Sequence, residues 1–405
     1  MNKLIVYVCF YWPLVFSCLQ LQGVIYKFSS STISANIAYL NLGLIVAGIF
    51  MIRKHIEITS STSRLWFIFY IMYYCFAILA TGISGFPASI IATLIPIIYY
   101  TGFYFLLSNK DEYKIFFKVI TITFVISSVV TIIFVKFNYS IVTGEVNIYG
   151  IDRAAGLYGD ANNAALASII AYTLFDKFYN PTKLPFKIFK ILILLTIFYS
   201  IFLTFSTTGL FVFTIIFFIT NYTFFTGIRV VLLGVAVTAM YAGIFSLKSQ
   251  TKDLDLTDAQ ITKVDNIINI LTLNLDKVDN SGRGDLLKNI LHYMYENPLL
   301  GNGVNFSGVM RGHNTYVGVW VDAGVFTFIF FIFILSYYFF KTFTLKIHLR
   351  FFAISILLTL YVFMVSLQTV LNQPYLFVLF LLVGYLIDYN KLNEGHLDFL
   401  DENEN

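Results

Sequence analysis

Apolar runs of membrane-spanning length recur from one end of this chain to the other. A helix needs about 20 apolar residues to cross a bilayer. Only 12% of the residues are charged and 58% are hydrophobic, whereas a soluble domain has roughly 25% charged residues. The runs leave no room for a separate soluble domain. We therefore expect residues 1–405 to form a single transmembrane domain, an all-α, polytopic integral membrane helical bundle that has the lipid bilayer as a partner.

Charged and turn-rich stretches divide the apolar residues into about 12 expected transmembrane helices. These cover roughly 4–20, 37–53, 65–85, 88–108, 115–136, 161–176, 189–206, 208–226, 229–247, 314–340, 351–370 and 375–389. The stretches 65–108 and 189–226 are interpreted as hairpins, because a single helix of either length would overrun the bilayer.

The placement of lysine and arginine predicts the orientation, because these residues accumulate in cytoplasmic loops. With the N-terminus inside, the inner segments hold 16 basic residues and the short outer loops hold 3. Both termini are therefore expected in the cytoplasm, including an acidic tail at 391–405. The long connection 248–312 then forms one large external loop. Its apolar spacing at Ile267, Ile270 and Leu271 predicts amphipathic helices along the membrane surface.

Several classes of function find no support in the sequence. The formal charge of +4 is small and dispersed, so no nucleic acid partner is expected. The three cysteines show no metal or redox spacing. Asp253 and Asp255 form the one Asp-x-Asp pair on the outer side and are interpreted as a solvated surface. With no phosphate-binding loop or dinucleotide fingerprint either, we expect no metal and no cofactor.

Polar chemistry is concentrated between residues 281 and 324, directly before a long apolar run. Gly312 allows a turn at His313, and Asn314 can cap the helix that follows. A helix N-terminus offers free N–H groups to an anion. A lone interfacial histidine is more often structural. Arg311, Asn314 and the outward position favour His313 as a base.

Two further arginines, Arg283 and Arg153, are candidate anion-binding residues. Arg283 lies between glycines in Ser-Gly-Arg-Gly-Asp, and its planar fork suits phosphate. It could equally pair with a neighbouring aspartate at the surface. Arg153 lies ahead of the helix expected from residue 161. Asn162 and Asn163 either cap that helix or bind sugar hydroxyls, and capping is favoured for at least one of them.

The run SGRGDLLKNILHYMYENPLLGNGVNF, followed by GHNTYVGVWVDAG, resembles the O-antigen polymerase and ligase superfamily. Those proteins carry an arginine, an Asn-Pro-Leu-x-Gly-x-Gly turn and a His-Asn-x-Tyr signature at the end of a large periplasmic loop. The upstream RAAGLYGDANNAA is similar to their Arg-x-x-Gly…Asn segment. The resemblance implies a bacterial inner membrane protein that handles an undecaprenyl diphosphate-linked oligosaccharide on the periplasmic face.

The resemblance also implies roles for individual residues in a metal-independent, inverting glycosyltransferase. His313 would be the general base. Arg153 and Arg283 would bind the diphosphate, with Arg311 as a weaker third, and would replace a metal by stabilising the leaving charge. Asn314, Asn162 and Tyr316 complete the expected substrate-binding set.

The sequence favours a polymerase, which extends a glycan on its lipid carrier. Ligases of this superfamily, which transfer the glycan to lipid A core, usually carry an arginine after a Thr-x-(Ser/Thr) turn. Here TFSTTGLFVF has none. A flippase or transporter for the same lipid-linked sugars is the alternative from another class, but should show polar residues or broken helices at mid-bilayer depth. A structural scaffold is the simplest alternative. Whether a chain-length regulator binds stays open.

Overall fold

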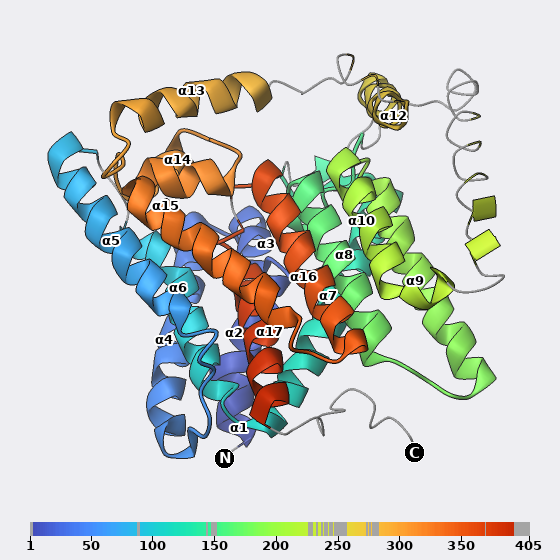
Figure 1. Ribbon diagram of the computed structural model, residues 1–405, viewed down its shortest axis with the longest axis horizontal. Coiled ribbons are helices and arrows are strands. Elements are labelled where there is room, and N and C mark those ends of the chain that lie inside the picture. The colour runs from blue at the N-terminus through green and yellow to red at the C-terminus, as the bar shows by residue number, and fades with distance from the viewer. Residues whose placement is uncertain are drawn as a thin grey trace.

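The computed structural model describes residues 3–86, 90–142, 145–146, 152–225, 230–231, 234–235, 238, 242, 246, 257–272, 274, 277, 283–368 and 370–392. Helices dominate these residues (Figure 1). In chain order the helices are α1 (Lys3–Val6), η1 (Tyr7–Tyr11), α2 (Trp12–Cys18), α3 (Leu21–Phe28), α4 (Ser31–Ile52), η2 (Arg53–His55), α5 (Leu65–Ser84), α6 (Ile90–Leu106), α7 (Lys110–Lys136), η3 (Gly156–Tyr158), α8 (Ala161–Phe178), α9 (Leu184–Leu203), α10 (Thr207–Thr220), η4 (Tyr222–Phe225), α12 (Asp258–Leu271), α13 (Arg283–Glu296), α14 (Phe306–Val309), α15 (Thr315–Thr342), α16 (Ile347–Ser366) and α17 (Pro374–Leu392). The strands β1 (Tyr139–Ser140) and β2 (Glu145–Val146) pair antiparallel.

The described helices confirm the predicted all-α, polytopic membrane fold. Six segments are long and apolar enough to cross a membrane: Ser31–His55, Leu65–Ser84, Lys110–Lys136, Leu184–Leu203, Thr315–Thr342 and Ile347–Ser366. A seventh arises if the bent pair Lys3–Cys18 and Leu21–Phe28 is one span. The expected number of about 12 stays a prediction, and most of the expected span at 229–247 lies outside the described residues.

Helix α17 forms the centre of the bundle. Every residue from Pro374 to Ile387 is buried, as expected for a helix that is apolar on all sides. It packs against α2, α6, α15 and α16. At its far end, Asp388 accepts hydrogen bonds from the Ser60 hydroxyl (2.6 Å) and the Thr62 backbone N–H (2.9 Å). These bonds tie α17 to the loop between α4 and α5.

The first expected span, 4–20, is helical over Lys3–Cys18 and ends at a bend that the sequence did not predict, after which α3 begins. The chain bends by 72° between α2 and α3. Gln20 lies at the bend with a left-handed backbone (φ 49°). Its side-chain amide donates a hydrogen bond to the Ser17 carbonyl oxygen (3.2 Å), which also accepts one from the Gln20 backbone N–H (3.1 Å). The apolar pattern alone does not reveal this bend.

Helices from the long connection cover one end of the bundle. In Figure 1, α13 runs across the ends of the spanning helices, with α14 beneath it and α12 to one side. The N-terminal helix α1 and the last turns of α17 lie at the opposite end. The helices expected within 248–312 are therefore present in its described part, and the two ends of the bundle differ clearly in structure.

Candidate functional site

The glycine-rich turn at 297–303 docks onto a break in α15. At Gly324 the helix leaves helical geometry (φ 78°, ψ 175°). The backbone N–H groups of Asn302 and Gly303 donate to the carbonyl oxygens of Val321 (2.7 Å) and Asp322 (3.1 Å). The turn thus supplies hydrogen bonds that the broken helix cannot make within itself. The uninterrupted helix expected over 314–340 is corrected accordingly.

Two glycines of the sequence motif allow this close backbone approach. A Cβ atom at Gly301 would lie 2.4 Å from the Asp322 carbonyl oxygen, and one at Gly324 would lie 1.9 Å from the Leu299 carbonyl oxygen. Both glycines also have positive φ, which other residues adopt at a cost. The turn and the Asp-Ala-Gly segment are therefore two halves of one structural unit.

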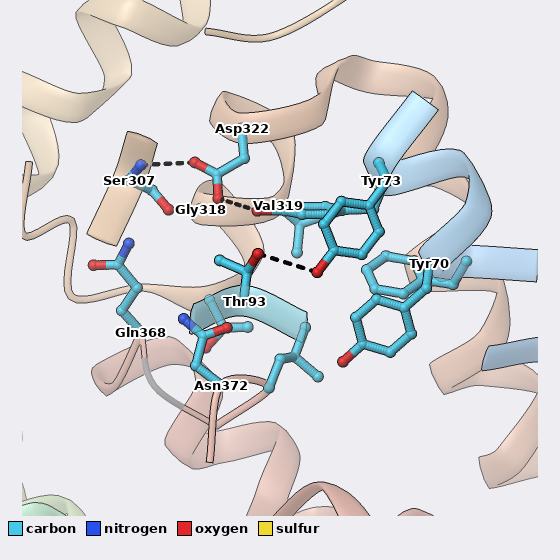
Figure 2. Close-up of a pocket in the computed structure, with 13 residues that line it drawn as sticks. Tyr70, Tyr73, Thr93, Ser307, Gly318, Val319, Asp322, Gln368 and Asn372 are labelled. Atoms are coloured by element: carbon cyan, nitrogen blue, oxygen red, sulfur yellow. Dashed lines mark hydrogen bonds between the residues drawn. The ribbon is translucent and has the colours of Figure 1, made fainter. Parts of the chain in front are cut away.

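This unit places the carboxylate of Asp322 in the interior. Asp322 is only 5% exposed. One carboxylate oxygen accepts a hydrogen bond from the Ser307 backbone N–H (2.6 Å), and the other accepts one from the Tyr73 hydroxyl (2.8 Å) (Figure 2). Such partners offset part of the cost of burying a charge. Our predicted site residues did not include Asp322, although it follows the His-Asn signature closely in the sequence.

A small cavity of about 40 Å³ lies beside Asp322. Figure 2 shows its lining, to which α5, α6, α14, α15 and the loop after α16 contribute. Two lining groups, the Gln368 side-chain nitrogen and the Tyr70 hydroxyl, are buried without a hydrogen-bond partner among the described residues. Buried polar groups are normally paired. These groups are therefore available to a ligand.

His313 lies next to this cavity, at the start of α15. Its side chain is exposed and its backbone is left-handed (φ 49°). The backbone N–H of His313 donates to the side-chain oxygen of Gln368 (3.3 Å), which lines the cavity. Arg311, two residues earlier, is also exposed with positive φ. The imidazole is therefore exposed at the start of α15.

Asn314 caps α15, as the sequence predicts. Its side-chain oxygen accepts a hydrogen bond from the Val317 backbone N–H (3.0 Å). The Thr315 hydroxyl donates to the Leu367 carbonyl oxygen (2.6 Å) and so anchors the helix start to the end of α16. Tyr316, by contrast, donates its hydroxyl to the Tyr361 carbonyl oxygen (3.0 Å). In this structure, its hydroxyl joins α15 to α16.

Arg153 and Asn162 form a second polar group, at the start of α8. The Arg153 guanidinium donates to the Thr204 carbonyl oxygen (3.2 Å) and to the Asn162 side-chain oxygen (3.3 Å). The same oxygen of Asn162 accepts a hydrogen bond from the Ser206 hydroxyl (2.8 Å). The group therefore gathers on the turn between α9 and α10.

The predicted capping role of the paired asparagines is wrong. Asp160 caps α8, because its side-chain oxygen accepts the backbone N–H groups of Asn162 (2.9 Å) and Asn163 (3.0 Å). An aspartate is as good a cap as an asparagine. This leaves the side chain of Asn162, which is buried, to bind Arg153.

Nearby, burial raises the pKa of Tyr158, whose hydroxyl remains a donor to the Cys18 carbonyl oxygen (3.1 Å).

The structure does not bring all predicted residues into one cavity. Arg153 and Asn162 do not line the cavity beside Asp322. Arg283 is the first residue of α13, and its side chain lies outside the described residues. The helix itself covers the site: Ile290 and Met294 pack with Phe306 and Val321.

These features define a polytopic helical membrane protein with a polar site at one end of its bundle. Residues 192–332 match the family model for O-antigen ligase, which confirms the resemblance to the O-antigen polymerase and ligase superfamily. Members of this family are glycosyltransferase-like enzymes. The match includes the turn that binds Arg153 and also His313, but not Arg153 itself. No curated protein matches the chain.

Proposed function

We propose that this chain is a polymerase of a bacterial surface polysaccharide. It transfers a growing glycan from undecaprenyl diphosphate to the terminal sugar of a lipid-linked repeat. The reaction takes place on the periplasmic face of the inner membrane, with both termini in the cytoplasm. The family match supports a glycosyltransferase-like enzyme of polysaccharide assembly. The position of α13, α14 and the start of α15 at one end of the bundle, opposite α1 and the last turns of α17, supports the choice of face.

In this mechanism His313 is the general base. Its imidazole accepts the proton of the acceptor hydroxyl as that oxygen attacks the anomeric carbon of the donor. The bond from this carbon to the diphosphate breaks, the electron pair leaves with undecaprenyl diphosphate, and the anomeric configuration inverts. The exposed side chain of His313 at the capped start of α15 supports this role. The nearby helix N-terminus favours negative charge.

Arginines stabilise the leaving diphosphate in place of a metal. The observation that carries the polymerase proposal is that Arg153 binds the Thr204–Ser206 turn. Ligases of the superfamily usually carry an arginine after this turn, which this chain lacks. We assign that task to Arg153, whose guanidinium donates to the Thr204 carbonyl oxygen (3.2 Å). We assign Arg283 and the exposed Arg311 to the same task, because guanidinium forks suit phosphate oxygens.

A ligase is the second candidate, favoured by the description of the matching family model. Its reaction would use the same lipid-linked donor but a lipid A core acceptor. A transporter is the third, favoured by the break in α15 at Gly324. That break lies nearer the α15 end that bears His313 than the far end, whereas a transporter needs breaks near mid-bilayer depth.

Lipid-linked products in a deletion strain test this proposal. A strain that lacks a polymerase makes only single repeat units outside the cytoplasm, each attached to lipid. Loss of a ligase instead accumulates long glycan on the undecaprenyl carrier. Loss of a flippase retains repeats on the cytoplasmic side. We expect single repeats, restored to a ladder by the wild-type gene, and either other pattern contradicts the polymerase assignment.

A further inference from the structure

A second and larger polar cavity lies at the bend of the first span. Its volume is about 240 Å³, far above the roughly 10–15 Å³ that one water needs. Side chains from three places line it: the α2–α3 bend, the helices α4 and α6, and the loop before α17. The polar members are Ser17, Gln20, Gln22, Asn41, Tyr99, Asn372 and Gln373.

The bend itself builds one wall of this cavity. Because Gln20 has left-handed backbone geometry, its amide turns toward the loop before α17. There it donates a hydrogen bond to the side-chain oxygen of Gln373 (3.1 Å). The Ser34 hydroxyl, in the first turn of α4, donates to the carbonyl oxygen of Gln22 in α3 (2.9 Å) and holds α3 against α4. The amide groups are thus placed by the fold.

Asn41 is the residue that points to a ligand. It lies in the middle of α4, is 1% exposed and lines the cavity. Neither its side-chain oxygen nor its side-chain nitrogen has a hydrogen-bond partner among the described residues. A buried amide without hydrogen-bond partners lowers the stability of the fold. If position 41 served packing alone, leucine would fill it at less cost.

The chemistry of the lining restricts the ligand. None of the described residues that line the cavity carries a charge, so a diphosphate would find no counter-charge there. Amide groups both donate and accept hydrogen bonds, which matches the hydroxyls of an uncharged sugar. Phe16 and Tyr99 add aromatic surface. Asn372 lines both this cavity and the one beside Asp322, which places the two cavities side by side.

We propose that this cavity binds an uncharged sugar ring of the lipid-linked glycan, with Asn41 as its central hydrogen-bonding residue. This inference rests on the proposed glycosyltransferase function. It adds a sugar subsite that is separate from the diphosphate-binding arginines. The ring belongs either to the donor glycan or to the acceptor repeat. The KM values measured for the two lipid-linked substrates distinguish these cases.

The test compares the full-length wild type with Asn41→Leu in proteoliposomes. Asn36→Leu is the matched control, since Asn36 lies on the same helix but is exposed. Binding of the free oligosaccharide, released from the lipid-linked repeat by mild acid, is measured by saturation-transfer NMR. The KM for each lipid-linked substrate and the thermal midpoint are measured in parallel.

We expect Asn41→Leu to weaken oligosaccharide binding and to raise one KM by about three- to tenfold, as for a lost neutral hydrogen bond. Its kcat stays within about twofold, and its thermal midpoint rises because an unpaired buried amide is removed. A raised donor KM assigns the ring to the donor, and a raised acceptor KM assigns it to the acceptor. Unchanged binding and unchanged KM values overturn the subsite. Because sugar binding is measured without turnover, a wild type that binds sugar but transfers none contradicts only the proposed function.

Discussion

At the scale of single residues, the proposed diphosphate binding depends on where the guanidinium of Arg153 is held. Arg153 lies about 50 residues before the turn that it binds, and two bonds from its guanidinium fix its direction. The sequence predicts a phosphate role for Arg153 from its neighbours, but its hydrogen bond to the Thr204 carbonyl oxygen is a tertiary contact. Spacing along a chain carries no signal for such a contact.

The substitution Arg153→Lys tests this placement. Lysine keeps the charge but cannot form the planar fork, so we expect glycan transfer to fall about tenfold or more, the cost of one charge-assisted hydrogen bond. Arg350→Lys is the control and should keep the wild-type rate of transfer. Arg350 lies near the start of α16, and its guanidinium donates to the carbonyl oxygens of Phe343 (2.9 Å) and Leu345 (3.1 Å). Equal activity of Arg153→Lys and wild type in a vesicle transfer assay would remove Arg153 from diphosphate binding.

At the scale of elements, the site depends on a helix that breaks at one glycine. The apolar pattern predicts the helix over 314–340 correctly in position, because burial in lipid demands apolar residues at every turn. It misses the break at Gly324, because the compensating hydrogen bonds come from residues 298–303. The same limit hides the bend at Gln20, whose stabilising partners lie partly in the loop before α17.

The substitution Gly324→Ala tests the role of the break. The new Cβ would lie 1.9 Å from the Leu299 carbonyl oxygen, so the turn must move away from α15 and release Asp322. We expect a loss of roughly 1–3 kcal/mol in unfolding free energy from strained backbone and overpacking, with loss of transfer activity. Gly43→Ala on α4 has no atom within 4 Å of its new Cβ and should keep its thermal midpoint. Similar midpoints for both variants would contradict the account.

At the scale of the whole molecule, one end of the bundle concentrates the chemistry. His313 and the cavity beside Asp322 belong to the part of the molecule that α13 covers, and the amide-lined cavity adjoins that cavity through Asn372. Composition predicts the membrane bundle and the polar external loop, because lipid and water select different side chains. It cannot predict the two cavities, since each one joins helices from both halves of the chain.

The most direct measurement is glycan elongation in proteoliposomes that contain the purified chain and its lipid-linked repeat alone. The wild type should build a ladder of longer lipid-linked glycans. His313→Ala should build none, while His292→Ala should match the wild type, because the exposed His292 pairs with Glu296 (3.1 Å) on α13. A wild type that only moves repeats across the membrane, or a His313→Ala variant that elongates normally, would contradict the account.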